Sequence, residues 1–334
     1  MSDLHDVVRQ QAHDSGFSGA VRVERSGNVQ IEQAFGEAHR SCGLPNAAST
    51  KFAIASGAKG FTALTIWSLV ADGTLSLQTT ARSLLGADLP LIDDAVTVEQ
   101  LLGHRSGIGD YLDEADWKPD DYVLSVPVHQ LDRAEDYLAV LDGRPQVFAP
   151  GERFAYNNGG FVVLAILAER CTGLPFHELV EQRVSRPAGL SDTGFLRSDE
   201  LPGDTAVGYL HAEGLRSNVL HLPVRGTGDG GIYTTVADMS HLWYAATSGR
   251  IIPEQLWEHA VSPQAAAQDT RMRYGLGFWV HSTTSAVILE GSDAGVSFRS
   301  VHDPATETTW TVISNTSNGA WPLVKTLYTK LNPA

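Results

Sequence analysis

Positive charge is scarce in this 334-residue chain, which has 24 lysines and arginines against 39 aspartates and glutamates and a formal net charge of −15 at pH 7. Surfaces that bind nucleic acid or anionic membranes need clustered lysine and arginine side chains. No apolar run reaches the roughly 18 residues that a membrane-spanning helix requires. We therefore expect neither a nucleic-acid partner nor a membrane partner.

Cysteine is also scarce. The two cysteines, Cys42 and Cys171, cannot form a disulfide framework and are typical of a reducing compartment. The first twenty residues lack the basic and apolar regions of a signal peptide. Together these two absences predict a cytoplasmic protein. The rest of the composition, 43% hydrophobic and 19% charged, is that of an ordinary globular chain with enough apolar material for a large core.

Strand-like and helical patterns are unevenly distributed along the chain. Residues 19–25 and 29–35 alternate apolar and polar side chains around a glycine-containing turn, which predicts a hairpin. Three further strand-like runs are predicted near the C-terminus, at residues 274–281, 286–290 and 309–314. Helices are predicted at the two ends, at residues 3–15 and 321–331. Thr97 begins a capping-box pattern, and Thr235 is a predicted helix N-cap.

The middle of the chain has a different pattern of predicted elements. Between residues 74 and 225, short helical segments alternate with loops rich in glycine, proline and aspartate, and residues 159–170 form a strongly apolar helix. We therefore predict an α+β fold with an antiparallel sheet built from both termini and flanked by helices. Its sheet domain comprises residues 1–75 and 226–334, and residues 76–225 form an inserted, mostly helical domain. A cleft between two such domains is the expected place for a site.

Ser56 and Lys59 stand at the start of a segment whose apolar residues fall on every side, so that a buried helix is predicted. Residues three apart share one face of a helix, which brings the ammonium beside the hydroxyl. A serine is a poor nucleophile until a neighbour accepts its proton, and a helix N-terminus favours negative charge nearby. The pair predicts an activated nucleophile. The same spacing also arises by chance, so the pair alone leaves a purely structural interpretation open.

Tyr156 and Asn158 lie in a loop just before the apolar helix. Their structural interpretation is a solvated loop with capping residues. Two other motifs are rejected. Gly226–Gly231 spells a dinucleotide-binding pattern without the acidic residue that should follow about twenty positions later. His177 begins a zinc-helix pattern that lacks its second histidine. We expect no metal and no cofactor.

Several motifs in order resemble one family. Ser56-x-x-Lys59 and Tyr156-x-Asn158, together with residues 101–107, 229–238 and 274–277, resemble the penicillin-recognising serine hydrolases. The similar branch contains class C β-lactamases, D-alanyl-D-alanine carboxypeptidases, D-aminopeptidases and β-lactamase-like esterases. The likeness runs from about residue 18 to the end. It implies a β-lactamase/transpeptidase-like fold with an active site between two lobes.

The resemblance also implies roles for individual residues. Ser56 would be the acylated nucleophile and Lys59 its neighbour, Tyr156 would accept the serine proton, and Asn158 would orient the substrate. Whether Lys59 or Tyr156 is the base stays open. An oxyanion hole is expected from the backbone N–H of Ser56 and one N–H near Ser292 or Asp293. His104, within the 101–107 motif, is predicted to be a structural hydrogen-bonding residue.

The third motif of the family departs from its usual form. A basic residue is expected on the strand that lines the site, but the matching position falls on Leu289, Glu290 or Gly291. We therefore take Glu290, Gly291, Ser292 and Asp293 as substrate-binding candidates. The missing cation and the nearby acids disfavour anionic substrates by like-charge repulsion, unless these acids merely lie in solvent at the strand end.

The sequence thus predicts a serine hydrolase that cleaves a small neutral or amine-bearing ester or amide. A β-lactamase, a D,D-peptidase or a D-aminopeptidase is the alternative among enzymes. A non-catalytic binding or sensor module on the same fold is the alternative of another class. The sequence does not indicate an oligomeric state.

Overall fold

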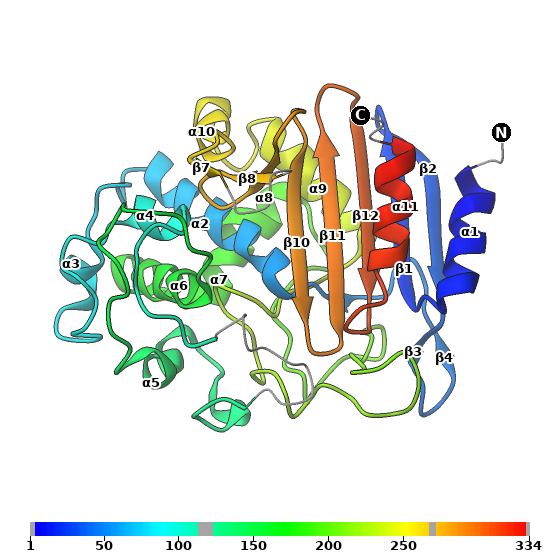
Figure 1. Ribbon diagram of the computed structural model, residues 1–334, viewed down its shortest axis with the longest axis horizontal. Helices are drawn as coiled ribbons and strands as arrows, with labels where there is room; N and C mark the ends of the chain where they lie inside the picture. The colour runs from blue at the N-terminus through cyan, green and yellow to red at the C-terminus, as the bar shows by residue number, and fades with distance from the viewer. Residues whose placement is uncertain (1–3, 113–122, 267–271, 332–334) are drawn as a thin grey trace.

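The computed structural model describes residues 4–112, 123–266 and 272–331. Its main feature is one antiparallel sheet with the strand order β2-β1-β12-β11-β10-β9-β8-β7 (Figure 1). The strands of this sheet are β1 (Gly19–Arg25), β2 (Asn28–Phe35), β7 (Ala265–Ala266), β8 (Met272–Tyr274), β9 (Trp279–His281), β10 (Val287–Asp293), β11 (Val296–Asp303) and β12 (Thr308–Ser314). Because β1 pairs with β12, the two ends of the chain build a single sheet.

Two small sheets accompany the main one. They pair β3 (Glu37–His39) with β4 (Leu44–Pro45) and β5 (Phe52–Ala53) with β6 (Tyr233–Thr234). The second pair matters for the site, because it joins the segment before Ser56 to the loop that ends at Gly231.

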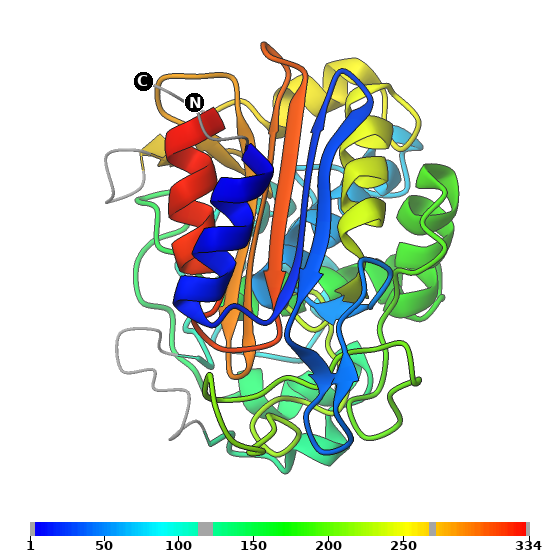
Figure 2. The same ribbon diagram turned by 90° about the vertical axis from the view of Figure 1, so that its right-hand side faces the viewer.

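Helices cover both faces of the main sheet. Helices α1 (Leu4–Ser15) and α11 (Trp321–Leu331) lie side by side on one face, and α9 (Val236–Thr247) covers the other (Figure 2). Every residue of β12 is buried, because side chains of both orientations meet a helical layer. This arrangement agrees with the predicted α+β fold. The division into domains at residues 75 and 225 stays a prediction.

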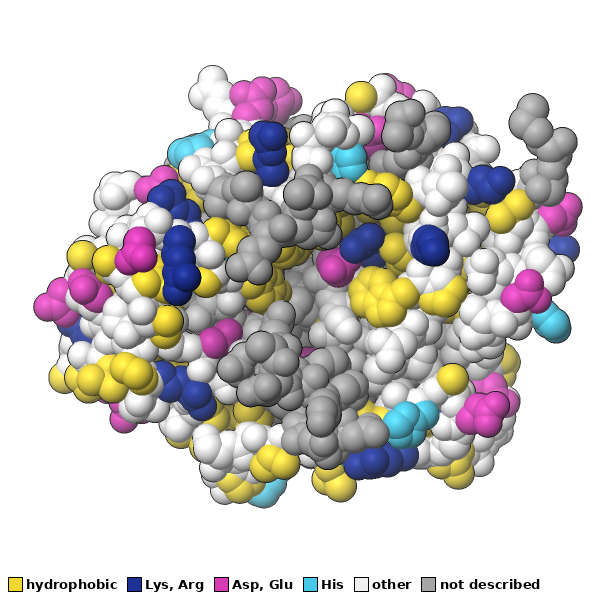
Figure 3. All heavy atoms as spheres, viewed as in Figure 1, with side chains coloured by type: hydrophobic (Ala, Val, Ile, Leu, Met, Phe, Trp, Pro, Cys, Tyr) yellow, Lys and Arg dark blue, Asp and Glu magenta, His cyan; other side chains and the backbone are white. Residues whose placement is uncertain are grey.

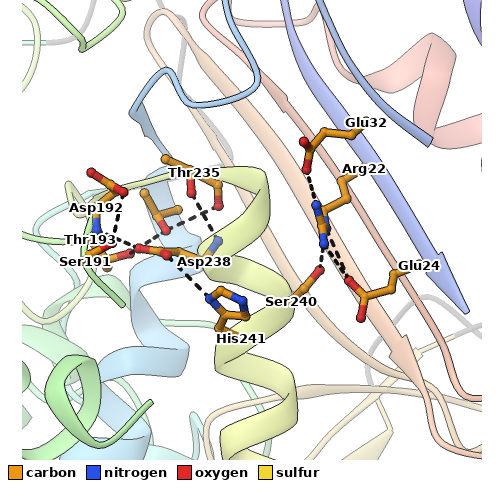
Figure 4. A network of polar contacts seen from close by, with 11 residues as sticks. Arg22, Glu24, Glu32, Ser191, Asp192, Thr193, Thr235, Asp238, Ser240 and His241 are labelled. Carbon is orange, nitrogen blue, oxygen red and sulfur yellow. Dashed lines mark hydrogen bonds and ion pairs between the residues drawn. The ribbon is translucent and has the colours of Figure 1, made fainter. Parts of the chain in front are cut away.

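Helix α9 is tied to its surroundings by buried polar groups as well as by packing. Arg22 on β1 donates from Nε to the Ser240 hydroxyl at 3.2 Å, and its guanidinium also contacts Glu24 and Glu32 (Figure 4). At the start of the helix, the buried Asp238 carboxylate accepts the Thr193 hydroxyl at 2.7 Å. These contacts fix α9 to both the sheet and the helical part of the chain.

The other helices lie mainly on the left of Figure 1, away from α1 and α11. They are α2 (Ala58–Ala71), α3 (Ala81–Leu85), α4 (Val98–Leu102), α5 (Leu138–Leu141), α6 (Asn158–Thr172), α7 (Phe176–Val180), α8 (Arg186–Ala188) and α10 (Glu254–Ala260). Short 3-10 turns cover Ala55–Gly57, Val128–Gln130 and Ala134–Tyr137, and a π-helical turn covers Glu181–Ser185. Helices α2 and α6 are almost completely buried, as their apolar residues on all sides require.

Among the described helices, none is long and apolar enough by itself to cross a membrane. The segments Asn158–Thr172 and Phe176–Ala188 meet the length and composition together, with a bend of 86° between them.

Several local predictions are confirmed. The N-terminal helix, the first hairpin and the apolar helix α6 are present, and both Thr97 and Thr235 cap their helices. One strand prediction is wrong, and one strand was missed. Residues 274–281 are not one strand, because Gly277, with φ at 112°, lies in a turn between β8 and β9. Strand β11 was not predicted, since the serines that it buries break the alternation of apolar and polar residues.

Candidate active site

Ser56 lies in a turn of 3-10 helix that leads directly into α2, at the point where the chain leaves β5. The preceding residue, Ala55, has φ at 45°, a left-handed conformation that costs a non-glycine residue about 1–2 kcal/mol. Such strain persists only where the surroundings impose it, and it concentrates at functional sites. A strained residue thus directly precedes the serine that the sequence predicts, although Ser26, Leu89, His104 and Glu307 also have a positive φ.

Two glycines let the start of α2 lie directly against the sheet. A Cβ atom at Gly57 would be 2.5 Å from the ring of Phe298, and one at Gly60 would be 2.6 Å from a methyl group of Leu289. Both distances are far below ordinary contact. The spacing of these glycines thus brings Ser56 to the edge of strands β10 and β11.

Lys59 joins three distant parts of the chain. Its Nζ atom donates hydrogen bonds to Ser56 Oγ at 2.9 Å, to Asn158 Oδ1 at 2.8 Å and to the backbone carbonyl of Asp229 at 2.8 Å. The same atom lies 5.0 Å from the centre of the Tyr156 ring, and the lysine side chain is buried. The structure therefore brings Ser56, Lys59, Tyr156 and Asn158 together.

The Tyr156 ring is held between other rings. It stacks on Trp279, with the planes 9° apart, and lies 4.3 Å from the ring of His104. His104 accepts the Asn157 N–H at its Nδ1 atom, and burial holds its pKa well below the ordinary value, so that the imidazole is neutral. His104 thus packs against the Tyr156 ring and accepts a backbone hydrogen bond, as a structural residue does.

Asn158 is positioned by the N-terminus of α6. Asn157 caps this helix by accepting the Gly160 N–H, and Asp110 accepts the backbone N–H groups of Asn158 at 2.7 Å and Gly159 at 2.9 Å. Burial raises the pKa of Asp110, although these hydrogen bonds and the charge on Lys59 oppose the shift. The sequence analysis missed Asp110, because nothing local connects it with a helix that begins 48 residues later.

Strand β10 runs past the nucleophile. A Cβ atom at Gly291 would be 2.1 Å from the carbonyl oxygen of Ile54 and 2.9 Å from the backbone nitrogen of Ser56. Within the described residues, β9 pairs with β10 only as far as Ile288, so the edge of the strand from Leu289 onward is unpaired on that side. Backbone groups of the third motif therefore face the region of Ser56.

The other candidates from the third motif differ in their surroundings. Glu290 is ion-paired with Arg299, its register partner on β11, so its charge is compensated. Ser292 is exposed, and Asp293 is partly buried and accepts the Ala294 N–H at 2.8 Å. Glu290 therefore contributes little to the expected repulsion of anionic substrates, and that expectation now depends on Asp293.

Two hollows meet at Ser56, and the face of the molecule is hollowed near its middle (Figure 3). The inner cavity, of about 70 Å³, is lined by Ser56 together with Tyr111, Tyr137, Asn158, Asp229, Tyr233 and Ser292, among others. The outer groove, of about 340 Å³, is lined by Ser56, Leu112, Tyr156, Trp279 and residues 290–293. A nucleophile between two hollows can bind one half of a substrate on each side.

A larger hollow of about 1080 Å³ lies elsewhere, around Arg170. It is open, and Arg170 is already ion-paired with Asp88 and Glu135. In the described part of the chain, no group of three or more histidine, cysteine, aspartate or glutamate side chains is arranged to hold a metal ion.

The sequence analysis also missed Tyr111 and the side chain of Asp229. Asp229 lies within a predicted family motif, but the motif gave it no role. Its carboxylate accepts the Tyr111 hydroxyl at 2.5 Å, and burial raises its pKa against the opposing effect of Lys59. The two residues are 118 positions apart, so no local pattern could have paired them.

The chain is similar to known proteins of one family. A family model described as Beta-lactamase matches residues 4–331. The solved structure of a penicillin binding protein from Bacillus halodurans has a TM-score of 0.89 at 33% identity, covering 96% of this chain and 99% of that one. This similarity confirms the predicted β-lactamase/transpeptidase-like fold.

Two curated relatives carry names of enzymes. The esterase EstB of Burkholderia gladioli is 33% identical over 62% of this chain and 54% of its own length. A D-aminopeptidase of Brucella canis is 27% identical over 80% of this chain and 50% of its own length. The chain spans between 50% and 66% of the length of such curated relatives.

Proposed function

Because the chain belongs to the beta-lactamase family, we propose that it is a serine hydrolase that cleaves a small ester or amide through an acyl-enzyme on Ser56. The observation that carries this proposal is the contact of Lys59 with Ser56 and Asn158, with the Tyr156 ring 5.0 Å away. A nucleophile needs a neighbour that takes its proton, and this arrangement supplies two candidates.

Charge around Lys59 favours Tyr156 as the proton acceptor. Asn158 Oδ1 and the Asp229 carbonyl can only accept hydrogen bonds, and the carboxylates of Asp110 and Asp229 stabilise positive charge on the lysine. An ammonium donates its third N–H to the Ser56 oxygen, so the serine proton must go elsewhere. Ionising an ordinary phenol at pH 7 costs about 4 kcal/mol. A cation about 5 Å away, at an effective dielectric of about 20, returns roughly 3 kcal/mol.

The reaction then proceeds in two balanced halves. Ser56 Oγ attacks the substrate carbonyl carbon while its proton passes to the Tyr156 oxygen, and the bond to the leaving group breaks as that group takes the proton. Water next gives a proton to the Tyr156 oxygen while its own oxygen attacks the acyl carbon. The bond between that carbon and Ser56 Oγ then breaks, Tyr156 returns the proton to Oγ, and the acid is released. Backbone N–H groups of Ser56 and of the β10 edge are the donors proposed for the carbonyl oxygen.

Neutral or amine-bearing substrates fit the site better than anionic ones. Both hollows contain carboxylates, and among the described residues that line them there is no lysine, arginine or histidine. A substrate carboxylate there would meet the like charges of Asp229 and Asp293, and the described lining residues offer it no cationic side chain. This consideration favours an esterase or amidase over a β-lactamase or a D,D-peptidase.

Labelling of Ser56 tests the proposal. A fluorophosphonate probe should add one equivalent to the wild type and none to Ser56→Ala, and p-nitrophenyl acetate should be turned over faster than nitrocefin. Undiminished turnover by Ser56→Ala would refute the mechanism. If the wild type is acylated by no activated ester or amide, a non-catalytic module becomes the better description.

A further inference from the structure

Leu196 lies between two hollows of very different size. In the described part of the chain, it is the one residue that lines both the inner cavity beside Ser56 and the large hollow around Arg170. The inner cavity has a volume of about 70 Å³ and the large hollow one of about 1080 Å³. Leu196 itself is partly buried. A single side chain therefore separates a small space at the nucleophile from a much larger one.

The rest of the wall between these two hollows is thin. Two segments of the chain run side by side there, because the Ser198 N–H donates to the Val224 carbonyl at 2.7 Å. The Arg225 Nε atom also donates to the Phe195 carbonyl, at 3.0 Å. Phe195 and Arg225 line the large hollow. Val224 and Ser198 line the inner cavity. Residues of the same two segments thus face opposite hollows, and Leu196 contributes to both.

The proposed proton transfers place the acyl group in the inner cavity. The leaving group takes its proton from the Tyr156 oxygen, and Tyr156 lines the outer groove. Ser56 lines the outer groove and the inner cavity alike. The acyl chain extends from the carbonyl carbon in the direction opposite to the leaving group. It therefore enters the inner cavity.

The volume of the inner cavity limits the length of that chain. One water molecule requires roughly 10–15 Å³ of such volume, so about 70 Å³ holds about five to seven groups of that size. Methylene groups are bulkier than water, so an acyl chain of about four carbons fills the cavity. Beyond Leu196, the apolar side chains of Leu174, Leu190 and Phe195 line the large hollow. The space that a longer chain needs is present, but Leu196 closes the way to it.

We propose that Leu196 sets the length of the acyl group, so that the enzyme cleaves esters or amides of straight-chain acids of up to about four carbons. This inference rests on the proposed acyl-enzyme at Ser56. Replacing Leu196 by alanine removes the branched end of the side chain and joins the inner cavity to the large hollow. A longer chain then has a path through the wall. The bonds that form and break at Ser56 Oγ stay the same.

Two series of esters test the assignment of the hollows in the wild type. The p-nitrophenyl esters of butanoic, hexanoic and octanoic acid lengthen the acyl chain alone, and the acetates of butanol, hexanol and octanol lengthen the leaving group alone. Along the acyl series, kcat/KM should fall about ten-fold or more, because methylenes that a pocket cannot hold are strongly rejected. Along the acetates it should not fall, since the outer groove offers about 340 Å³. An equal fall in the two series, or none in the acyl series, would overturn the proposal.

Leu196→Ala tests the residue itself. Each methylene that gains a buried position is worth about a factor of four, so the octanoyl-to-butanoyl ratio of kcat/KM should rise at least about ten-fold. Leu174 and Leu222 give matched controls, since among the described lining residues Leu174 belongs to the large hollow alone and Leu222 to the inner cavity alone. Leu174→Ala should keep the wild-type ratio. Leu222→Ala enlarges the cavity without opening it and should raise the ratio less than Leu196→Ala does.

Fluorophosphonate labelling of Ser56 separates this inference from the proposed function. If the wild-type serine is not labelled, the proposed function fails. If it is labelled but Leu196→Ala leaves the octanoyl-to-butanoyl ratio unchanged, only the role of Leu196 fails. Should Leu196→Ala not fold, Leu196→Val trims the side chain less and should raise the hexanoyl-to-butanoyl ratio. An unchanged ratio in that variant would likewise overturn the inference.

Discussion

Replacing Gly291 by alanine should push strand β10 away from Ser56. The new Cβ atom would lie 2.1 Å from the Ile54 carbonyl oxygen, 2.9 Å from the Ser56 nitrogen and 3.0 Å from the Gly57 nitrogen. Ordinary contacts begin near 3.4 Å, so the backbone must move by more than 1 Å, and no flexible side chain can move instead. Overpacking of this kind typically costs 1–3 kcal/mol. A misplacement of about 1 Å at a reacting group lowers the rate about 100-fold.

We therefore expect Gly291→Ala to lower the fluorophosphonate labelling rate of Ser56 at least about 100-fold and the free energy of unfolding by about 2–3 kcal/mol. Labelling rates are read by mass spectrometry, and stability by urea unfolding followed through tryptophan fluorescence. Gly203→Ala is the matched control, since a Cβ atom there meets nothing within 4 Å and the backbone is not left-handed. Wild-type labelling and stability in Gly291→Ala would mean that β10 does not pack against the serine turn.

Two further predictions concern stability. Burial lowers the pKa of His177 to about 4. Its ring stacks on that of Phe195, and its Nε2 atom lies 2.7 Å from the Gly226 carbonyl oxygen. As the pH falls, His177 is protonated in the unfolded chain before it is protonated in the folded one. The free energy of unfolding is therefore unaffected by this group above about pH 6.5 and decreases toward pH 4, by up to roughly 3 kcal/mol. His177→Gln should lose less on going from pH 7 to pH 4.5 in urea titrations, and equal losses would contradict the argument. Asp110→Ala removes two hydrogen bonds from the start of α6, and should lower the free energy of unfolding by about 1–2 kcal/mol and slow Ser56 labelling, whereas Asp94→Ala should do neither.

The sequence predicted best those features that depend on neighbouring residues. The Ser56–Lys59 contact follows from helical spacing, and the caps at Thr97 and Thr235 follow from short local patterns. Strand β11 was missed for a physical reason, because it buries Ser300, whose hydroxyl bonds to Thr311 and to the Trp243 indole. A polar residue that is satisfied by distant partners looks exposed in the sequence alone.

The part of the site that could not be predicted depends on close backbone packing. A Cβ atom at Gly228 would be 2.0 Å from the Phe161 carbonyl oxygen, and one at Gly226 would be 2.1 Å from the Gly230 carbonyl oxygen. The first contact places the Gly226–Gly231 loop against helix α6, and the second folds the loop closely on itself. In this loop the Asp229 carbonyl lies 2.8 Å from Lys59 Nζ. The glycines that imitate a dinucleotide-binding pattern are thus needed for packing. Because they allow the loop to come so close, Asp229 lines the inner cavity together with Ser56.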